Sequence, residues 1–278
     1  MRALTSLLML VSLLVLGGCD DKKSAPAKNA QDKTLKFIMS DVSFNAELEP
    51  ILKQELEKQG FVLDWVVVND IIQPNEMVDA GSADANAFQH EPYFNQFVQD
   101  HGLKHIVKGF YTTYTPSGLY SRKYKSLEDL PDGAVIGIPV DPANNGRALF
   151  MLRDHGLLKL RDGIDVTHAN LHDIIENPRH FKFREVDQMM LQRAFEDVDA
   201  GFLFSLYAKK LGLDLVKDAL AIESADDSPY KGIVAIRKDL VDSPKIKALQ
   251  NAYASATIKE FYGRRYGNAI VFLDKYNK

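Results

Sequence analysis

The sequence contains a single cysteine among its 278 residues, Cys19. One thiol cannot form a disulfide within the chain, so a disulfide-stapled fold is excluded. An excess of basic residues is missing as well, because 34 Lys and Arg stand against 38 Asp and Glu, which gives a formal charge of −4. Proteins that bind nucleic acid use clustered positive charge, so we expect no nucleic-acid partner.

Long hydrophobic runs are confined to the N-terminus. Arg2 precedes an apolar run over residues 7–16, and no later segment approaches the roughly 18 apolar residues that a spanning helix needs. This pattern is typical of a signal peptide, which we place at residues 1–18. The letters LGGC, which end at Cys19, resemble the bacterial lipoprotein box. The resemblance implies acylation of Cys19, with palmitate among the acyl groups, and a membrane anchor. The alternative is an ordinary secretory signal with a chance cysteine.

An acidic residue, Asp20, directly follows the cysteine. In Gram-negative lipoproteins an aspartate there resembles the signal for retention in the inner membrane. We therefore expect a lipid anchor on the periplasmic side of the inner membrane, although an acidic start to a tether would look the same. Residues 20–34 carry no large apolar side chain, so they cannot bury enough surface to offset the entropy of ordering. We interpret residues 19–34 as a flexible tether.

From Leu35 onward the sequence alternates apolar runs with amphipathic stretches, a pattern of strands followed by helices. Runs with the length of buried strands are 35–39, 61–68, 83–88, 134–140, 198–206 and 232–236. Stretches with helical spacing are 44–59, 92–101, a segment from about Asn144 to Gly156, and 244–262. This order favours an α/β fold with parallel sheets covered by helices.

Two such α/β units predict two lobes. The second unit starts near Tyr124 and ends near Leu220, and strand 232–236 is able to return the chain to the first sheet. We therefore predict a first lobe of residues 35–123 and 221–278 and a second lobe of residues 124–220. Two lobes joined by two crossings form a cleft, which is a common place for a small-molecule site.

The most informative site signal is the strand–loop–helix at residues 134–147. A helix that begins near Asn144 presents free N–H groups and the positive end of its dipole, and Arg147 would lie in its first turn. A cation is unfavourable there unless an anion compensates it. A bound carboxylate would do so and would accept hydrogen bonds from the guanidinium. An exposed arginine on an ordinary surface helix remains an equal alternative.

A second cluster, Phe88, His90 and Tyr93, lies at a predicted strand-to-helix corner. Such corners face ligands in parallel α/β sheets, and aromatic faces suit an apolar or thioether group. On the residues alone, the two aromatic rings are as well explained as core and the histidine as a structural one.

Several ordered motifs resemble the methionine-binding lipoprotein family of the NlpA/MetQ type. They are VNDIIQPNE, DANAFQHEPYF, IPVDPANNGRAL, DIIENP and DSPYKGIVAI, and the resemblance runs from about Leu35 to the end. It implies a type-2 periplasmic binding-protein fold, with two α/β lobes around a hinged cleft. It also implies a substrate-binding component that delivers methionine, or a related small carboxylate-bearing amino acid, to an ABC permease and its ATPase. No cofactor is implied.

The resemblance also implies roles for individual residues. Phe88, His90 and Tyr93 match family positions around the ligand side chain. Arg147 matches the arginine that holds the ligand carboxylate, and Asn145 lies in the same loop.

Four positions depart from the family pattern. The family usually has an aromatic residue where Ile71 stands, and asparagines where Val140, Phe204 and Gly232 stand. An ammonium left without partners in a desolvated site costs several kcal/mol. Either other groups replace the lost asparagines or the ligand differs from free methionine. Candidates for replacement are Asp141, Tyr111 and Tyr114.

Three other readings remain. A metal site would use the pairs His101/His105 and His168/His172, but neither pair stands in an HExxH motif, and we expect no metal. An enzyme is disfavoured because the GxSxG, Walker and GxGxxG motifs are missing. An envelope lipoprotein could also keep the fold with a changed ligand, or act as an adhesin or assembly factor without transport.

Overall fold

Two β-sheets form the framework of the described chain. The computed structural model describes residues 33–39, 47–223 and 228–273, which belong to one compact unit. The signal peptide, Cys19, Asp20 and most of the tether lie outside the described residues.

The first sheet has six strands in the order β13-β4-β12-β3-β1-β2. Strand β1 pairs in parallel with β2 and β3, whereas β12 runs antiparallel to β3 and β4. The strands are β1 (Thr34–Met39), β2 (Val62–Val67), β3 (Ala85–Ala87), β4 (Ile106–Tyr114), β12 (Lys231–Arg237) and β13 (Val271–Phe272).

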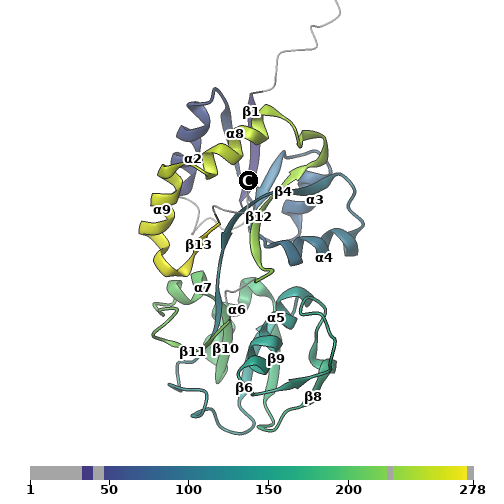
Figure 1. Ribbon diagram of the computed structural model, residues 1–278, viewed down its shortest axis with the longest axis vertical. Helices are drawn as coiled ribbons and strands as arrows, with labels where there is room; N and C mark the ends of the chain where they lie inside the picture. Colours follow the sequence, from purple (N-terminus) through teal and green to yellow (C-terminus); the bar gives the residue numbers. More distant parts are fainter. Residues whose placement is uncertain (1–32, 40–46, 224–227, 274–278) are drawn as a thin grey trace, which may run out of the picture. The chain divides into compact units, whose positions relative to one another are not determined.

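Helices cover both faces of this sheet, as Figure 1 shows. The helices are α2 (Leu48–Glu57), α3 (Gln73–Asp79), α4 (Glu91–His101), α8 (Pro244–Tyr253) and α9 (Ala256–Tyr266). Alternation along β1 explains the two layers, since successive side chains of a strand point to opposite faces. Phe37 packs with residues of α2, α8 and α9, whereas Ile38 packs with residues of α3 and α4.

The second sheet has five strands in the order β11-β5-β10-β6-β9. Strand β6 is parallel to β9 and β10, and β5 runs antiparallel to β10 and β11. The strands are β5 (Ser117–Tyr120), β6 (Val135–Pro139), β9 (Lys182–Val186), β10 (Ala200–Phe204) and β11 (Ala219–Ile222). With it lie α5 (Pro142–Asp154), α6 (Leu191–Ala194), α7 (Ser205–Lys210) and the small pair β7 (Lys159–Leu160) and β8 (Ile174–Glu176).

The α/β pattern read from the sequence is confirmed, but the expectation of parallel sheets is wrong in part, because β4, β5, β11, β12 and β13 form antiparallel pairs. Two of the predicted helices also need correction. Helix α5 begins at Pro142 and not near Asn144, because the Asp141 side chain accepts a hydrogen bond from the Asn144 N–H and caps the helix. The predicted helix 244–262 is two helices, because Ser255 leaves helical geometry and its side chain caps α9.

The predicted lobe boundaries stay a prediction. The chain crosses from one sheet to the other twice, once between β4 and β5 and once between β11 and β12. Strand β5 of the second sheet (Ser117–Tyr120) precedes the boundary that we predict at residue 124.

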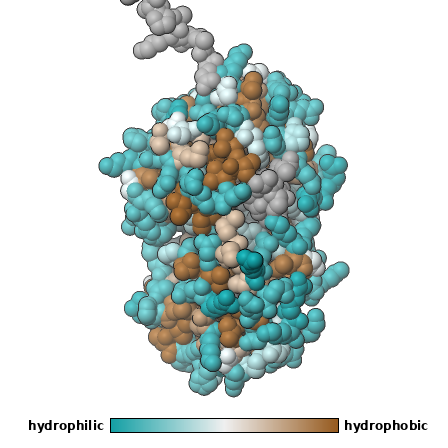
Figure 2. Space-filling model, turned by 180° about the vertical axis from the view of Figure 1, so that it is seen from behind, coloured by the Kyte–Doolittle hydropathy of each residue, from teal (hydrophilic) through white to brown (hydrophobic). Residues whose placement is uncertain are grey.

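The exposed hydrophobic side chains are distributed over several elements. Val216 is 64% exposed, Ile175 is 54% exposed, and they lie on different parts of the chain. Figure 2 shows hydrophobic areas separated by hydrophilic side chains on one face. Within the described ranges, no helix has the length and apolarity needed to cross a membrane.

Candidate functional site

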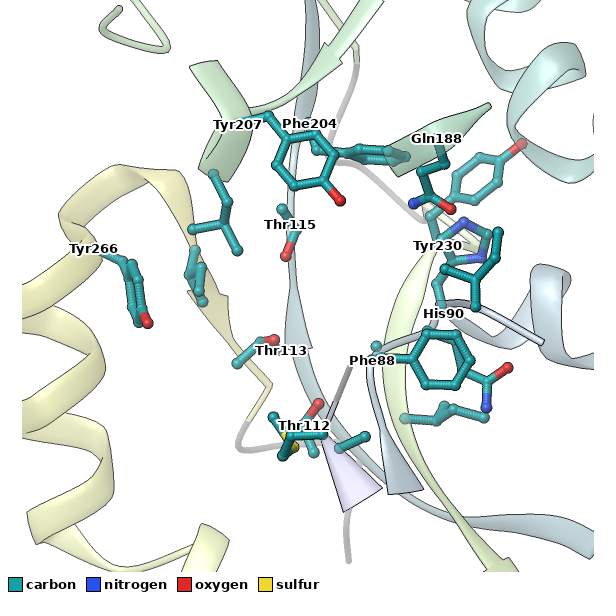
Figure 3. Close-up of a pocket in the computed structure, with 18 of the residues that line it drawn as sticks. Phe88, His90, Thr112, Thr113, Thr115, Gln188, Phe204, Tyr207, Tyr230 and Tyr266 are labelled. Atoms are coloured by element: carbon teal, nitrogen blue, oxygen red, sulfur yellow. The ribbon is translucent and has the colours of Figure 1, made fainter. Parts of the chain in front are cut away.

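A cavity is lined by residues of both sheets and their connections (Figure 3). Its volume is about 190 Å³, far above the roughly 10–15 Å³ that one water needs. Phe88 and His90 line it from the end of β3, Phe204 lines it from the end of β10, and Arg147 lines it from α5. Phe88, His90 and Phe204 come from the carboxyl ends of strands, where α/β proteins commonly bind ligands, and Arg147 comes from the second turn of α5.

Arg147 is a buried residue of the cavity wall, with 3% of its surface exposed. Its Nε donates to Glu223 Oε2 at 2.7 Å, and its Nη2 donates to Glu223 Oε1 and, at 2.9 Å, to the Thr115 carbonyl. The guanidinium also lies 4.2 Å from the centre of the Tyr230 ring. The alternative of an exposed surface arginine is therefore wrong.

The anion that compensates Arg147 belongs to the protein itself. Arg147 is the sixth residue of α5, beyond its first turn, because the helix begins at Pro142. Glu223 supplies the negative charge that we had expected from a ligand, and it also accepts hydrogen bonds from Tyr114 Oη and the Ser117 N–H. The carboxylate of Glu223 raises the pKa of Arg147 against the opposing effect of burial.

This pairing uses only part of the guanidinium. An arginine has five N–H donors, and Nη1 carries two of them. No hydrogen bond joins Nη1 to any residue that the structure describes. Glu223 thus fixes the orientation of Arg147 from one edge and leaves two donors for a ligand in the cavity.

Helix α5 reaches the cavity through close backbone packing. A side chain at Gly146 would overlap the backbone oxygen of Val166, so only glycine allows this approach. Asp141 caps the helix through Oδ1, and its Oδ2 is buried without a hydrogen-bond partner among the described residues. Burial raises the pKa of the Asp141 carboxyl.

His90 connects the first sheet to α5. Its Nδ1 accepts a hydrogen bond from the Tyr93 N–H at the start of α4, and its Nε2 lies 2.9 Å from Asn144 Oδ1. Because Nδ1 is an acceptor, the neutral ring carries its proton on Nε2 and donates it to Asn144. Burial and the nearby charge of Arg147 lower the pKa of His90 to about 3.

The structure brings three of the predicted ligand-binding residues to the cavity wall: Phe88, His90 and Arg147. The other three support them. Tyr93 packs edge-on against Phe88 and His90 and donates to the Ile71 carbonyl, and Tyr114 donates to Glu223. Asn145 donates to the Pro139 carbonyl and to Glu185, so its amide ties α5 to the second sheet.

A buried amide cluster, which the sequence did not reveal, holds the strand end that carries Phe88 and His90. Asn86 donates to Asn75 at 3.0 Å, and Asn75 and Gln89 exchange hydrogen bonds of 2.9 and 2.6 Å. All three side chains are buried, and each bond links α3 to β3 or to the residue before His90. Satisfied buried networks of this kind fix one geometry.

The four positions that depart from the family pattern lie in different places. Ile71, Phe204 and Gly232 line the cavity, whereas Val140 is 53% exposed and does not line it. Phe204 faces Arg147, with 5.5 Å between the guanidinium and the ring centre. A Cβ at Gly232 would lie 2.8 Å from the Thr113 carbonyl oxygen, so an asparagine does not fit there without movement of β4.

The two histidine pairs were the candidate metal ligands in the sequence. In the described part of the chain, no group of three or more His, Cys, Asp and Glu side chains has the spacing to hold a metal ion. His101 stacks on Phe97, with 3.9 Å between the ring centres, and His168 lies on the surface beside Asp165.

Comparisons with known proteins decide the family. The model of the family described as NlpA lipoprotein matches residues 35–272 of this chain. The chain belongs to the NlpA lipoprotein family. The resemblance carried by the sequence motifs is thereby confirmed.

Two curated relatives of this family cover nearly the whole chain. Outer membrane lipoprotein 1 of Mannheimia haemolytica is 34% identical over 267 residues, which are 94% of this chain and 95% of that protein. D-methionine-binding lipoprotein MetQ of Salmonella typhi is also 34% identical over 267 residues, 94% of each chain.

A solved structure of the family extends the likeness to the fold. A nutrient-binding protein from Burkholderia cenocepacia, solved with bound methionine, superposes with a TM-score of 0.78 at 37% identity. The match covers 86% of this chain and 98% of that one. The predicted periplasmic binding-protein fold of this NlpA-family chain is confirmed.

Proposed function

We propose that this NlpA-family protein is the lipid-anchored substrate-binding component of an ABC importer. Its ligand is methionine or a related small carboxylate-bearing amino acid. The names of the Salmonella relative and of the methionine-bound Burkholderia structure support this class of ligand. Support from the chain itself comes from the cavity and from the one charged side chain among its described lining residues, Arg147.

The main support for the proposal is that the guanidinium of Arg147 has bonded and unbonded donors within the described residues. Glu223 and Thr115 hold Nε and Nη2, and Nη1 stays available on a residue that lines the cavity. A carboxylate that accepts the two N–H donors of Nη1 forms charge-assisted hydrogen bonds, which are stronger than neutral ones. Phe88 and His90 then contact the ligand side chain.

Binding couples to closure of the two predicted lobes, residues 35–123 with 221–278 and residues 124–220. The ligand touches Phe88 and His90 on the first sheet and Arg147 on the second, so it contacts both walls only when they are close. A ligand with more contacts in one conformation shifts the population toward it. The permease and its ATPase then recognise the closed form, as in hinged binding proteins.

The lipid anchor keeps the binding protein close to the permease that receives the ligand. In this proposal Cys19 is acylated, residues 19–34 form the tether, and Asp20 keeps the protein on the periplasmic side of the inner membrane. Tethering converts docking on the permease into a nearly intramolecular event and raises its effective concentration.

The test is a calorimetric titration of the full-length protein in lipid nanodiscs with methionine, for wild type and Arg147→Lys. Lysine preserves a positive partner for Glu223 but lacks the planar fork of donors. We expect binding by wild type and at least about tenfold weaker binding by the variant, a loss of about 1.4 kcal/mol. Equal affinities would show that the guanidinium does not hold the ligand.

Native mass spectrometry of the purified protein supplies an independent check. A co-purified species with the mass of a carboxylate-bearing amino acid supports the proposal. Ligand-free spectra that stay unchanged after incubation with a panel of amino acids would favour an envelope role without transport.

A further inference from the structure

Two helices that belong to different sheets meet at their N-terminal ends. Helix α4 follows β3 of the first sheet, and α5 follows β6 of the second sheet. Figure 1 shows α5 below α4 on the same side of the molecule. Ala143, at the start of α5, packs with Tyr93 and Phe97 of α4. This contact therefore joins the two predicted lobes.

One side chain links the residues that cap these helices. His90 is the N-cap of α4, and its Nδ1 accepts a hydrogen bond from the Tyr93 N–H. Asp141 is the N-cap of α5, and its Oδ1 accepts from the Asn144 N–H. The Asn144 side chain donates from Nδ2 to Asp141 Oδ1 at 2.9 Å, and its Oδ1 lies 2.9 Å from His90 Nε2. We call the chain of His90, Asn144 and Asp141 the cap bridge.

The direction of each hydrogen bond in the cap bridge follows from its neighbours. Asp141 Oδ1 is an acceptor, which places the amide nitrogen of Asn144 on that side and the amide oxygen toward His90. His90 Nδ1 is also an acceptor, so the proton of the neutral ring lies on Nε2 and is donated to that oxygen. A bond with a defined donor and acceptor holds the two caps in one arrangement.

The cap bridge is shielded from water at Asn144. This residue has 0% of its surface exposed, and Ala143 beside it has 1%. The Tyr230 ring lies edge-on to His90, with 5.0 Å between the ring centres, and its hydroxyl donates to the Ala143 carbonyl at 3.3 Å. Loss of a buried acceptor is more costly than loss of an exposed one, because no water replaces it.

We infer that the cap bridge is a latch, in which Asn144 stabilises the arrangement that brings the two predicted lobes together. Asn144 is not one of the described residues that line the cavity, so it is a positioning residue. Its bond to His90 consists of protein atoms alone and therefore contributes with or without a ligand. A hinge motion that moves α4 away from α5 breaks this bond, because its two ends belong to different lobes.

The latch has a consequence for affinity, and there the inference rests on the proposed function. Apparent affinity depends on the fraction of the protein that is in the binding-competent arrangement. In Asn144→Ala the His90 Nε2–H loses its acceptor when the lobes are together, whereas water reaches it when they are apart. A typical hydrogen bond changes an equilibrium by about two- to tenfold. We expect methionine to bind more weakly by up to that factor.

The test measures the distance between α4 and α5 in the full-length protein in lipid nanodiscs. Unfolding in urea and refolding first remove any co-purified ligand. Nitroxide labels at two exposed positions, Gln99→Cys and Asp154→Cys, report the distance by double electron–electron resonance. Mass spectrometry verifies that two labels attach, because the anchor occupies Cys19 in the proposed function. We expect Asn144→Ala to raise the ratio of long to short distances by about two- to tenfold.

A neighbouring asparagine is the matched control. Asn145 lies on the same helix, but it donates to the Pro139 carbonyl and to Glu185, which both belong to the second sheet. Asn145→Ala should therefore leave the ligand-free distances unchanged. Thermal unfolding verifies that both variants fold.

A double-mutant cycle assigns the effect to one bond. His90→Asn keeps a side chain that caps α4 but is too short to reach Asn144, so it should produce the same shift in distances. In that background Asn144→Ala should add nothing, because the bond is already lost. A general structural role of Asn144 would give the same shift in both backgrounds. His90→Asn alone tests the bond if Asn144→Ala does not fold.

The outcomes separate the two proposals. Equal ligand-free distances in wild type, Asn144→Ala and His90→Asn overturn the latch and leave the proposed function standing. An equal shift from Asn145→Ala, or additive shifts in the cycle, also overturn the latch. A coupled shift in a protein that shows no response to methionine supports the latch and overturns methionine as the ligand.

Discussion

Arg147 and Glu223 form a buried two-point ion pair across 76 residues of sequence at the wall of the cavity. Because the two charges compensate each other, this part of the cavity wall is close to neutral before any ligand arrives. A ligand carboxylate therefore meets donors on Nη1 of an arginine that is already positioned and already paired. Preorganisation of this kind lowers the entropy cost of binding.

The pair predicts a stability cost when its anion is neutralised. Glu223→Gln leaves the buried guanidinium without a counter-charge, and loss of one partner from a buried pair costs about 3–5 kcal/mol. Urea unfolding monitored by circular dichroism measures the change. The matched control is Glu176→Gln, which removes one partner of the exposed pair with Lys159 and is expected to cost less than about 1 kcal/mol. Similar losses in the two variants would contradict the burial argument.

The depressed pKa of His90 predicts how stability depends on pH. The folded ring stays neutral down to about pH 3, whereas the unfolded ring takes up a proton near its ordinary value of 6.5. Between these values the unfolded state binds more protons, so this contribution to stability is complete above pH 6.5 and declines as the pH falls toward 3. The slope from one such group is at most about 1.4 kcal/mol per pH unit.

A substitution isolates that slope. His90→Asn keeps a side chain that caps α4 but does not titrate, so the free energy of unfolding should depend less on pH between 3 and 6.5. His168→Asn, on the exposed surface, should retain the wild-type dependence. If His90→Asn has the full wild-type slope, other groups control acid unfolding.

Close packing of α5 predicts opposite effects of one change at two helical glycines. Gly146→Ala adds a methyl group that would lie 1.9 Å from the backbone oxygen of Val166, and it should destabilise by about 3 kcal/mol or more. Gly263→Ala in α9 meets open space and should stabilise by about 0.5–1 kcal/mol. Thermal unfolding distinguishes them, and a tolerated Gly146→Ala would refute the role of this glycine.

The anchor hypothesis makes a prediction about modification and location. Cys19→Ser should abolish incorporation of labelled palmitate, and Asp20→Ser should move the protein from inner-membrane to outer-membrane fractions on a density gradient. Asp21→Ser is the matched control and should leave the distribution unchanged. Palmitate incorporation into Cys19→Ser would show that the anchor lies elsewhere.

Local patterns in the sequence predicted the framework of the fold. Alternation along 35–39 and helical spacing around 92–101 depend on neighbours close in the chain, and β1 and α4 follow them. The break between α8 and α9 was missed because Ser255 lies inside an unbroken apolar spacing, and its capping role depends on a local change of backbone.

The site was only partly predictable. Phe88, His90 and Arg147 stood in recognisable motifs and do line the cavity. The partner of Arg147 was not foreseen, because Glu223 becomes its neighbour only when the chain crosses between the sheets.

The most direct test of the central claim is calorimetric titration of the full-length protein with methionine and with methioninol, which has a hydroxymethyl group in place of the carboxylate. If the free edge of Arg147 receives a carboxylate, methionine binds at least about tenfold more tightly than methioninol, a difference of about 1.4 kcal/mol. The Arg147→Lys variant should narrow that difference. Equal affinities of the wild-type protein for the two compounds would contradict the account.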